Sequence, residues 1–154
     1  MQYILFAKNK DVDNNFNAKA LRKLPGKLYH SEASDIRGTG TKLARRQLLH
    51  CLKKCKPKDT MGIPTTIPLK VNAKYMISYN VDTDDGICNG ATGTLKQINF
   101  GINLQGQRKP SRLWFEFDDE TTGAALRKKH STTMKNLSIP KNWTPITPIA
   151  MRVK

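Results

Sequence analysis

The clearest pattern in the chain is an alternation of hydrophobic and polar residues between Ile67 and Asp82. A period of two is typical of an extended strand with one face on a core and the other in solvent. The segment is long for one strand and Asn72 tolerates a bend, so the pattern predicts one curved strand or two short ones. Met76 is the one large apolar residue on the face expected to be polar, which also carries Lys70. The face expected to be buried carries Ile67, Leu69, Val71, Ala73, Tyr75, Ile77, Tyr79 and Val81.

A glycine-rich segment follows and predicts a sharp reversal of the chain. Gly86, Asn89, Gly90 and Gly93 supply positions at which a backbone with positive φ costs little free energy. These positions allow the alternating strand to turn back and pair with the strand-like segment 93–100.

A further strand is expected at 112–119, after a polar break at 106–112. In it, three apolar residues alternate with Trp114 and Glu116. Several short, strongly bent antiparallel strands are typical of a small β-barrel or a curled sheet. The apolar residues of this alternation are Leu113, Phe115 and Phe117.

The beginning of the chain predicts half of an α/β unit. Residues 3–7 form a short apolar run, and residues 9–24 have apolar positions at helical spacing. Pro25 and Gly26 are expected to end this helix, and a strand-like segment begins at Lys27. One strand and one helix cannot bury both of their faces, so this part is expected to belong to a larger α/β domain.

Two further segments complete the chain. Residues 41–56 predict a basic amphipathic helix, whose charged face is either solvated or in contact with phosphates. The last part carries several prolines after residue 130 and predicts an extended connection that returns the chain from the small barrel.

The charge of the chain is strongly unbalanced, and this imbalance is the main indication of a binding partner. The sequence has 27 basic and 12 acidic residues, a net charge of +15. Such a balance favours a polyanionic partner, nucleic acid first; the alternatives are a solvated basic surface or a packing protein of the ribosomal type. Three cysteines are an odd number, which is typical of a reducing compartment. We therefore expect a nuclear or cytoplasmic protein that is neither secreted nor bound to a membrane.

The sequence offers little catalytic chemistry. The glycines and the lysine in the segment 38–42 do not have the spacing of a phosphate-binding loop. Cys51 and Cys55 have no second pair at the spacing of a zinc site. Adjacent Asp118 and Asp119 would point to opposite faces of a strand, so a turn at the strand end is expected instead. We expect no catalytic residue, no metal site and no cofactor in this chain.

Three segments, in this order, resemble the C-terminal half of Pif-family DNA helicases of the Helitron type. They are 3–26 (YILFAKNKDVDNNFNAKALRKLPG), 68–95 (PLKVNAKYMISYNVDTDDGICNGATGTL) and 113–119 (LWFEFDD), the last followed shortly by Gly123. The resemblance covers most of the chain and is weakest at the basic helix and the tail. Asn72 stands where the family commonly has glycine, although asparagine also tolerates a positive φ.

The resemblance implies an α+β fold, in which a partial RecA-like α/β motor domain carries an inserted small Src-homology-three-like antiparallel β-barrel. On this basis, 1–35 is the start of the second motor domain (strand-helix-strand) and 36–66 is a basic helical connection. Residues 67–120 are the inserted barrel, and 121–154 return the chain toward the motor domain. The first motor domain would precede Met1 and later motifs would follow Lys154, so an internal fragment is expected.

Helicases of this family use ATP and Mg²⁺ to move 5′ to 3′ along single-stranded DNA, which the inserted barrel helps to hold. The resemblance thus implies a fragment that contributes to DNA binding, lacks the ATPase motifs, and works with the N-terminal RecA-like domain of its parent. A free-standing nucleic-acid-binding module and an inactive transposon remnant are the alternatives.

Candidate contact residues follow from charge and position. Lysine and arginine side chains neutralise phosphates, and an exposed indole stacks on a base. Trp114 is expected to be that exposed indole, with a place in the barrel core as the alternative. Lys8 and Asn9 follow the first strand and are expected near the nucleotide or the DNA, unless Asn9 caps the helix after it. The phosphate contacts expected are Lys74, Arg108 and Lys109.

Overall fold

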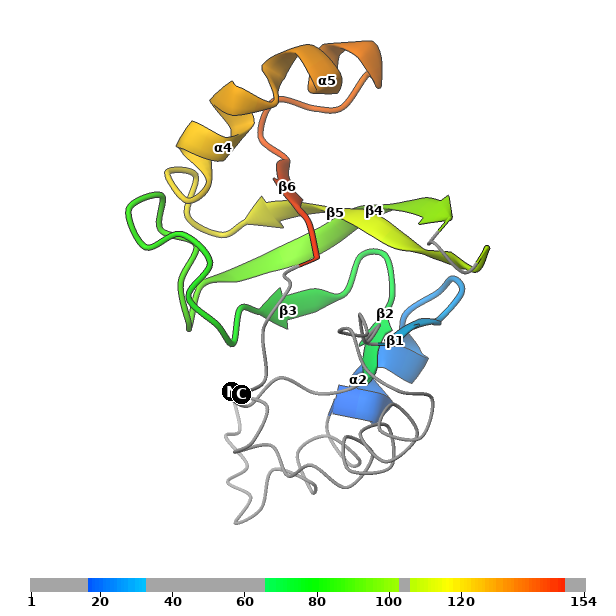
Figure 1. Ribbon diagram of the computed structural model, residues 1–154. Coiled ribbons are helices and arrows are strands. Elements are labelled where there is room, and N and C mark those ends of the chain that lie inside the picture. The colour runs from blue at the N-terminus through cyan, green and yellow to red at the C-terminus, as the bar shows by residue number, and fades with distance from the viewer. Residues whose placement is uncertain (1–16, 33–65, 103–105, 149–154) are drawn as a thin grey trace, which may run out of the picture.

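A computed structural model describes residues 17–32, 66–102 and 106–148 (Figure 1). Within these ranges the protein is of the mixed α+β class, with two antiparallel sheets. The described strands do not close into a barrel. The expected strand at 3–7, the basic helix at 41–56 and the two residues Lys8 and Asn9 lie outside the described residues.

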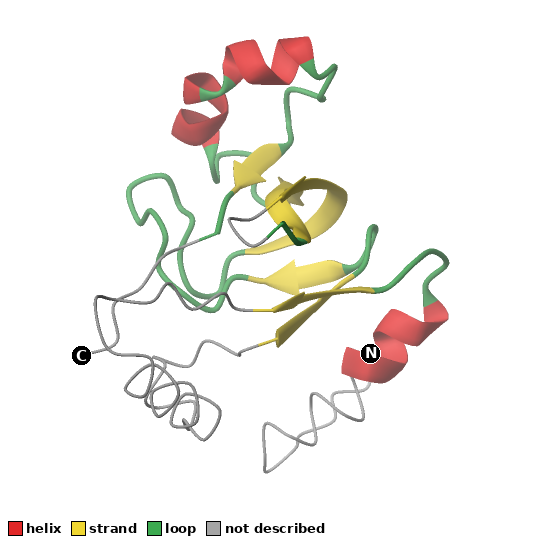
Figure 2. Ribbon diagram, turned by 45° about the vertical axis from the view of Figure 1, so that its right-hand side comes forward, coloured by secondary structure: helices red, strands yellow, loops and turns green. Residues whose placement is uncertain are grey.

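The larger sheet has four strands in the order β3-β4-β5-β6, each antiparallel to its neighbour. The smaller sheet pairs β1 with β2. Helices α4 and α5 lie on one side of the larger sheet, and α2 lies on the other side (Figure 2). The strands are β1 (Tyr29–Glu32), β2 (Thr66–Leu69), β3 (Lys74–Met76), β4 (Thr92–Ile102), β5 (Arg108–Phe117) and β6 (Thr144–Ile146). The helices are α2 (Ala18–Lys23), α4 (Ala124–Lys129) and α5 (Ser131–Asn136).

The alternating segment forms two short strands separated by a turn, one of the two forms predicted. Asn72 occupies the turn with φ 67°, and its backbone N–H donates a hydrogen bond of 2.7 Å to the carbonyl of Leu95. Leu69 and Ala73 are buried as expected, whereas Ile67 and Val81, expected on the same buried face, are exposed. Lys70 was expected on the polar face, and this is wrong. Its side chain is buried because its ammonium donates to the carbonyl of Leu21 at the end of α2.

The predicted reversal after this segment is confirmed at Gly90, which has φ 97°. Gly86 also has a positive φ, and the backbone N–H of Asn89 donates to Asn80 Oδ1. Gly93 has a different role. A Cβ at this position would lie 2.8 Å from the carbonyl oxygen of Glu116, so glycine lets β4 and β5 approach closely.

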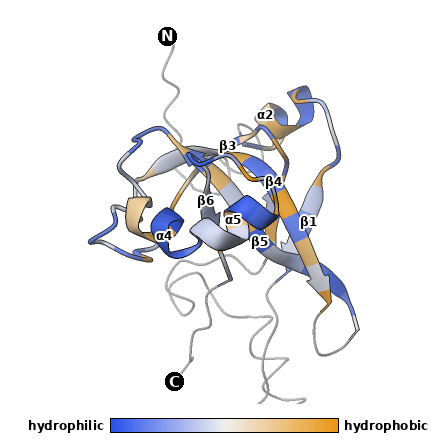
Figure 3. Cartoon of the chain, turned by 90° about the horizontal axis from the view of Figure 1, so that it is seen from above, coloured by the Kyte–Doolittle hydropathy of each residue, from blue (hydrophilic) through white to orange (hydrophobic). Residues whose placement is uncertain are grey.

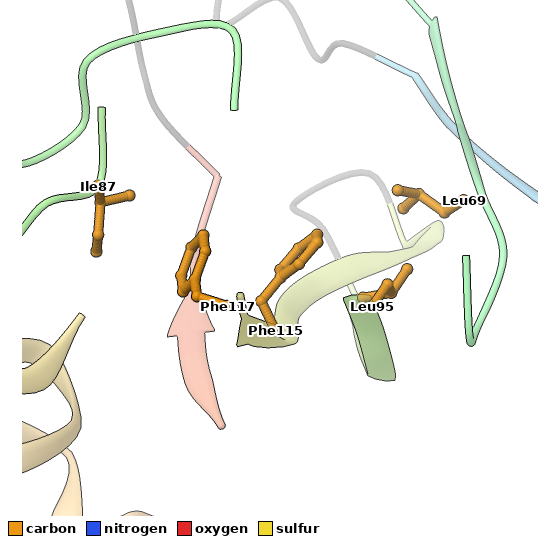
Figure 4. Packing of buried hydrophobic residues seen from close by; sticks show 5 residues of the cluster. All are labelled: Leu69, Ile87, Leu95, Phe115 and Phe117. Atoms are coloured by element: carbon orange, nitrogen blue, oxygen red, sulfur yellow. The ribbon is translucent and has the colours of Figure 1, made fainter. Parts of the chain in front are cut away.

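The main core lies between the two sheets and the reversal. Tyr75 meets Phe115 edge to face, with ring centroids 6.1 Å apart, a favourable aromatic geometry. Burial raises the pKa of Tyr75, and the hydrogen bond from the Lys70 backbone opposes this shift. The buried members of the core are Leu69, Ile87, Leu95, Phe115 and Phe117 (Figure 4). They come from four separate segments, so this core joins the halves of the described chain.

The opposite face of the larger sheet carries a second apolar cluster around Trp114, which is fully buried. It packs against Met134 of α5 and against Ile139 and Trp143 in the segment after that helix. The expectation that Trp114 is exposed is therefore wrong. The indole is buried in this second cluster and not in the main core, because the following helices cover the outer face of β5.

Two other expectations are corrected by this part of the structure. The segment 106–112 does not break the sheet, because β5 begins at Arg108. The ladder accommodates Pro110 next to a register shift between Asn99 and Phe100, a position where proline is tolerated. The extended conformation expected for the return segment 121–154 is also wrong at its start, because Ala124–Lys129 form α4 and Ser131–Asn136 form α5.

Candidate nucleic-acid interface

Charged residues are separated along the larger sheet. Among the described residues, the acidic side chains concentrate in two short segments, 82–85 and 116–120. The fold brings these segments together, since the carbonyl of Asp85 accepts a hydrogen bond from Gly123 just after the second one. This end of the sheet is therefore acidic, and we call it the acidic end.

Lys74 lies at the acidic end, and its charge is already compensated. Its ammonium contacts the carboxylate of Asp118 at 2.8 Å. The hydrogen bond from Lys74, and then the one from Thr92, hold the pKa of Asp118 below its usual range. Asp118 and Asp119 form the predicted turn at the strand end, where Asp119 accepts from the N–H and hydroxyl of Thr121.

Arg108 and Lys109 lie at the opposite end of the sheet. Arg108 pairs with Ile102, whereas Lys74 pairs with Thr94. At about 3.3 Å per residue, these two positions on β4 are about 26 Å apart. The fold therefore keeps Lys74 away from Arg108 and Lys109, so the expected contact residues do not form one site.

The end of the sheet at Arg108 carries a row of four side chains in which two tilted aromatic rings lie between two cations. The ammonium of Lys27 lies 5.3 Å from the centroid of the Tyr29 ring. The centroids of the Tyr29 and Phe100 rings are 5.0 Å apart. The guanidinium of Arg108 lies 4.4 Å from the centroid of the Phe100 ring. We call these four residues the tip cluster.

Local sequence explains how the tip cluster forms. Pro25 and Gly26, with φ 100° at the glycine, turn the chain out of α2 and direct Tyr29 into β1. β1 then lies beside the end of β4–β5, where the Lys109 ammonium donates to the carbonyl of Glu32 at 3.3 Å. Cation–π contacts at exposed sites contribute about 0.5–1 kcal/mol each, so they stabilise the arrangement of the tip cluster by a small amount.

Sequence reasoning named Arg108 and Lys109 as candidates and did not name Lys27, Tyr29 or Phe100. The available signal was weak, because these residues are separated by more than seventy positions in the chain, from Lys27 to Phe100. Only the pairing of β1 with β2, which no local pattern specifies, brings Tyr29 to Phe100.

Other kinds of site receive no support from the part of the chain that is described. There, no three histidine, cysteine, aspartate or glutamate residues are grouped so as to hold a metal ion. Cys88 is a free cysteine. None of the helices in the described ranges is long and apolar enough to cross a membrane.

Comparisons with known proteins assign no family to the chain. A scan against protein-family models found no match. A search of curated proteins also found no match.

Proposed function

We propose that this protein binds single-stranded nucleic acid without strong sequence preference, through the tip cluster and Lys109. The observation that carries the proposal is the stack of Arg108 on Phe100 at the end of the sheet opposite the acidic end. Single strands are held by cationic side chains along the backbone together with flat groups on which bases stack. Arg108 is exposed and planar, so it offers both a charge and a stacking face.

The wider proposal places this module in an ATP-driven DNA helicase of the Pif type. It rests on the sequence resemblance, which implies a RecA-like motor domain with an inserted Src-homology-three-like barrel. The two register shifts between the long strands β4 and β5 support a strongly bent sheet of that kind. In the parent enzyme, the module would hold the strand while the motor domains use ATP.

Arg108 provides the sharpest test of binding. Arg108→Ala should weaken binding to oligothymidine and make the log–log salt slope less steep by about 0.7, the value for one phosphate contact. Arg108→Lys keeps the charge and loses the plane, so it should leave the slope unchanged and still weaken binding, by roughly fivefold for about 1 kcal/mol of lost stacking. Fluorescence anisotropy over a range of salt concentrations measures both quantities.

The matched control is Lys141→Ala, which removes one exposed charge near Glu116 and Asp119 at the acidic end. It should change affinity far less than Arg108→Ala, because phosphates would avoid this end. Wild-type affinity and slope in both Arg108 variants would contradict the proposal.

The chain alone should not hydrolyse ATP. Phosphoryl transfer requires a lysine and backbone amides around the phosphates, together with a carboxylate-held Mg²⁺. A phosphate-release assay on the 154-residue chain with Mg²⁺-ATP and single-stranded DNA should show only background. Turnover that survives further purification and is lost on mutating Lys8 or Lys42 would show that the fragment interpretation is wrong.

A further inference from the structure

A second basic surface lies on the two helices that follow the larger sheet. The sequence from Thr121 to Lys154 contains no acidic residue. Within the described residues, the exposed Lys128, Lys129 and Lys135 of α4 and α5 have no ion pair. Figure 3, viewed from above, shows α5 and part of α4 in hydrophilic colours.

The lysines of the sheet contrast with these helical lysines. Lys74 and Lys96 contact carboxylates of the acidic end at 2.8 and 2.7 Å. Lys74 and Lys96 are thus paired with carboxylates, whereas the helical lysines have no such pair within the described residues.

Arg112 of β5 is half-buried, with its Nε enclosed, and lies on the strand that α5 covers. Its guanidinium lies 5.6 Å from the centroid of the Trp114 ring, and Trp114 packs under α5. Partial burial, then the charge of Arg112, then that of Lys129, lower the pKa of His130 at the junction of the two helices. Arg112 and Lys129 thus act on one imidazole from two different elements. We call Arg112, Lys128, Lys129 and Lys135 the helical basic surface.

The fold holds this surface rigidly. The carboxylate of Asp85 accepts the backbone N–H groups of Ala125 and Leu126 at 2.8 and 2.9 Å. Arg127 donates to the Thr144 hydroxyl and to two backbone carbonyls. Because these contacts fix the backbone of α4, a ligand that binds its side chains does not have to order this backbone, and the entropic cost of binding is smaller.

We propose that the helical basic surface binds phosphodiester groups of the same single strand that contacts the tip cluster. The inference rests on the proposed function and extends it from one contact point to a path across the protein. Grouped like charges repel one another unless a polyanion is present, and a strand of phosphates supplies the compensation that the described residues lack.

The competing interpretation is structural. Lysines in the last turn of a helix interact favourably with its macrodipole, and Lys128, Lys129 and Lys135 all lie in last turns. That role would affect folding stability and leave DNA binding unchanged, so binding measurements separate the two interpretations.

The test compares two lengths of oligothymidine on the full chain. One has about six nucleotides, enough for one surface, and the other about twenty, enough for both. The variant Lys128→Ala/Lys129→Ala/Lys135→Ala should make the salt slope for the long strand less steep by about 2, three times the value for one contact. It should leave binding of the short strand to the tip cluster nearly unchanged.

The pKa of His130 reports on phosphate binding at this surface itself, whereas a change in salt slope reports only on the number of charges removed. Phosphates beside the imidazole favour its protonated form, so the long strand should raise the pKa of His130. By linkage, binding to this surface should tighten as the pH falls through the histidine range. A proton NMR titration measures the shift, with His130→Gln to assign the signal among the three histidines.

The outcomes separate this inference from the proposed function. If the short strand binds and the triple variant keeps the wild-type slope for the long strand, the helical basic surface is not a phosphate site and the tip cluster remains one. If neither strand binds, both proposals fail. Binding to anionic lipid vesicles that depends on the three lysines, with DNA binding independent of them, would overturn the inference in favour of a membrane surface.

Discussion

Gly123→Ala is expected to destabilise the protein by about 3 kcal/mol. Gly123 has φ 77°, a conformation that disfavours any side chain. An added Cβ would also overlap Thr144 Cγ2 and lie 2.6 Å from Thr144 Oγ1. Thr144 is fully buried in β6 and accepts a hydrogen bond from Arg127, so it cannot move without breaking that contact. Urea unfolding of both proteins measures the difference in free energy.

Gly90→Ala is the control for this prediction. Gly90 has φ 97°, but a Cβ there would meet no atom within 4 Å. It should therefore cost only the backbone strain, about 1 kcal/mol. Equal effects of the two substitutions would mean that the close approach of Gly123 to Thr144 does not determine stability.

Asp85→Ala is expected to cost about 2–3 kcal/mol. The first turn of α4 has no cap from its own N-cap residue, and Asp85 supplies the acceptors from the loop before β4. Without this carboxylate, the N–H groups of Ala125 and Leu126 lose their partners. Chemical unfolding followed by tryptophan fluorescence, from Trp114 and Trp143 of the second cluster, measures the loss.

Two variants sharpen the test of Asp85. Asp84→Ala removes the same charge from the exposed neighbouring position and should change stability little. Asp85→Asn retains one acceptor oxygen and should lose about half as much stability as Asp85→Ala. A cost for Asp84→Ala as large as that for Asp85→Ala would show that charge, and not capping, determines the effect.

Local patterns predicted those features of the fold that depend on nearby residues. Alternation located β2, β3 and the end of β5, and Pro25–Gly26 marked the end of α2. The turn at Asn72 and the reversal at Gly90 followed from residues that accept a positive φ. Each of these features is decided within a few positions of the chain, where sterics and spacing act alone.

The sequence could not predict which faces the later segments cover. In β5, Phe115 and Trp114 point to opposite faces, and both are buried. From the sequence alone, a strand in which one face carries phenylalanines and the other a tryptophan looks half-exposed. Only the position of the following helix shows that the second face is covered as well. The tail formed α5 although its composition favoured an extended chain, because Met134 and Ile139 find an apolar surface on Trp114.

The candidate site was predicted only in part for the same reason. Arg108 and Lys109 were visible as a basic pair next to a strand. Lys74 was an equal candidate in the sequence, and only the fold shows its contact with Asp118.

Within the described residues, carboxylates gather at one end of the larger sheet and the tip cluster lies at the other, so charge is distributed unequally along this sheet. In the field of a polyanion, such a body rotates before contact and arrives with its positive end forward. Encounters at random orientation are the usual reason why specific association is slow compared with diffusion. Under the proposed function, the acidic residues beside Lys74 would act away from any contact, because they would repel the polyanion and help to set the orientation in which the two molecules meet.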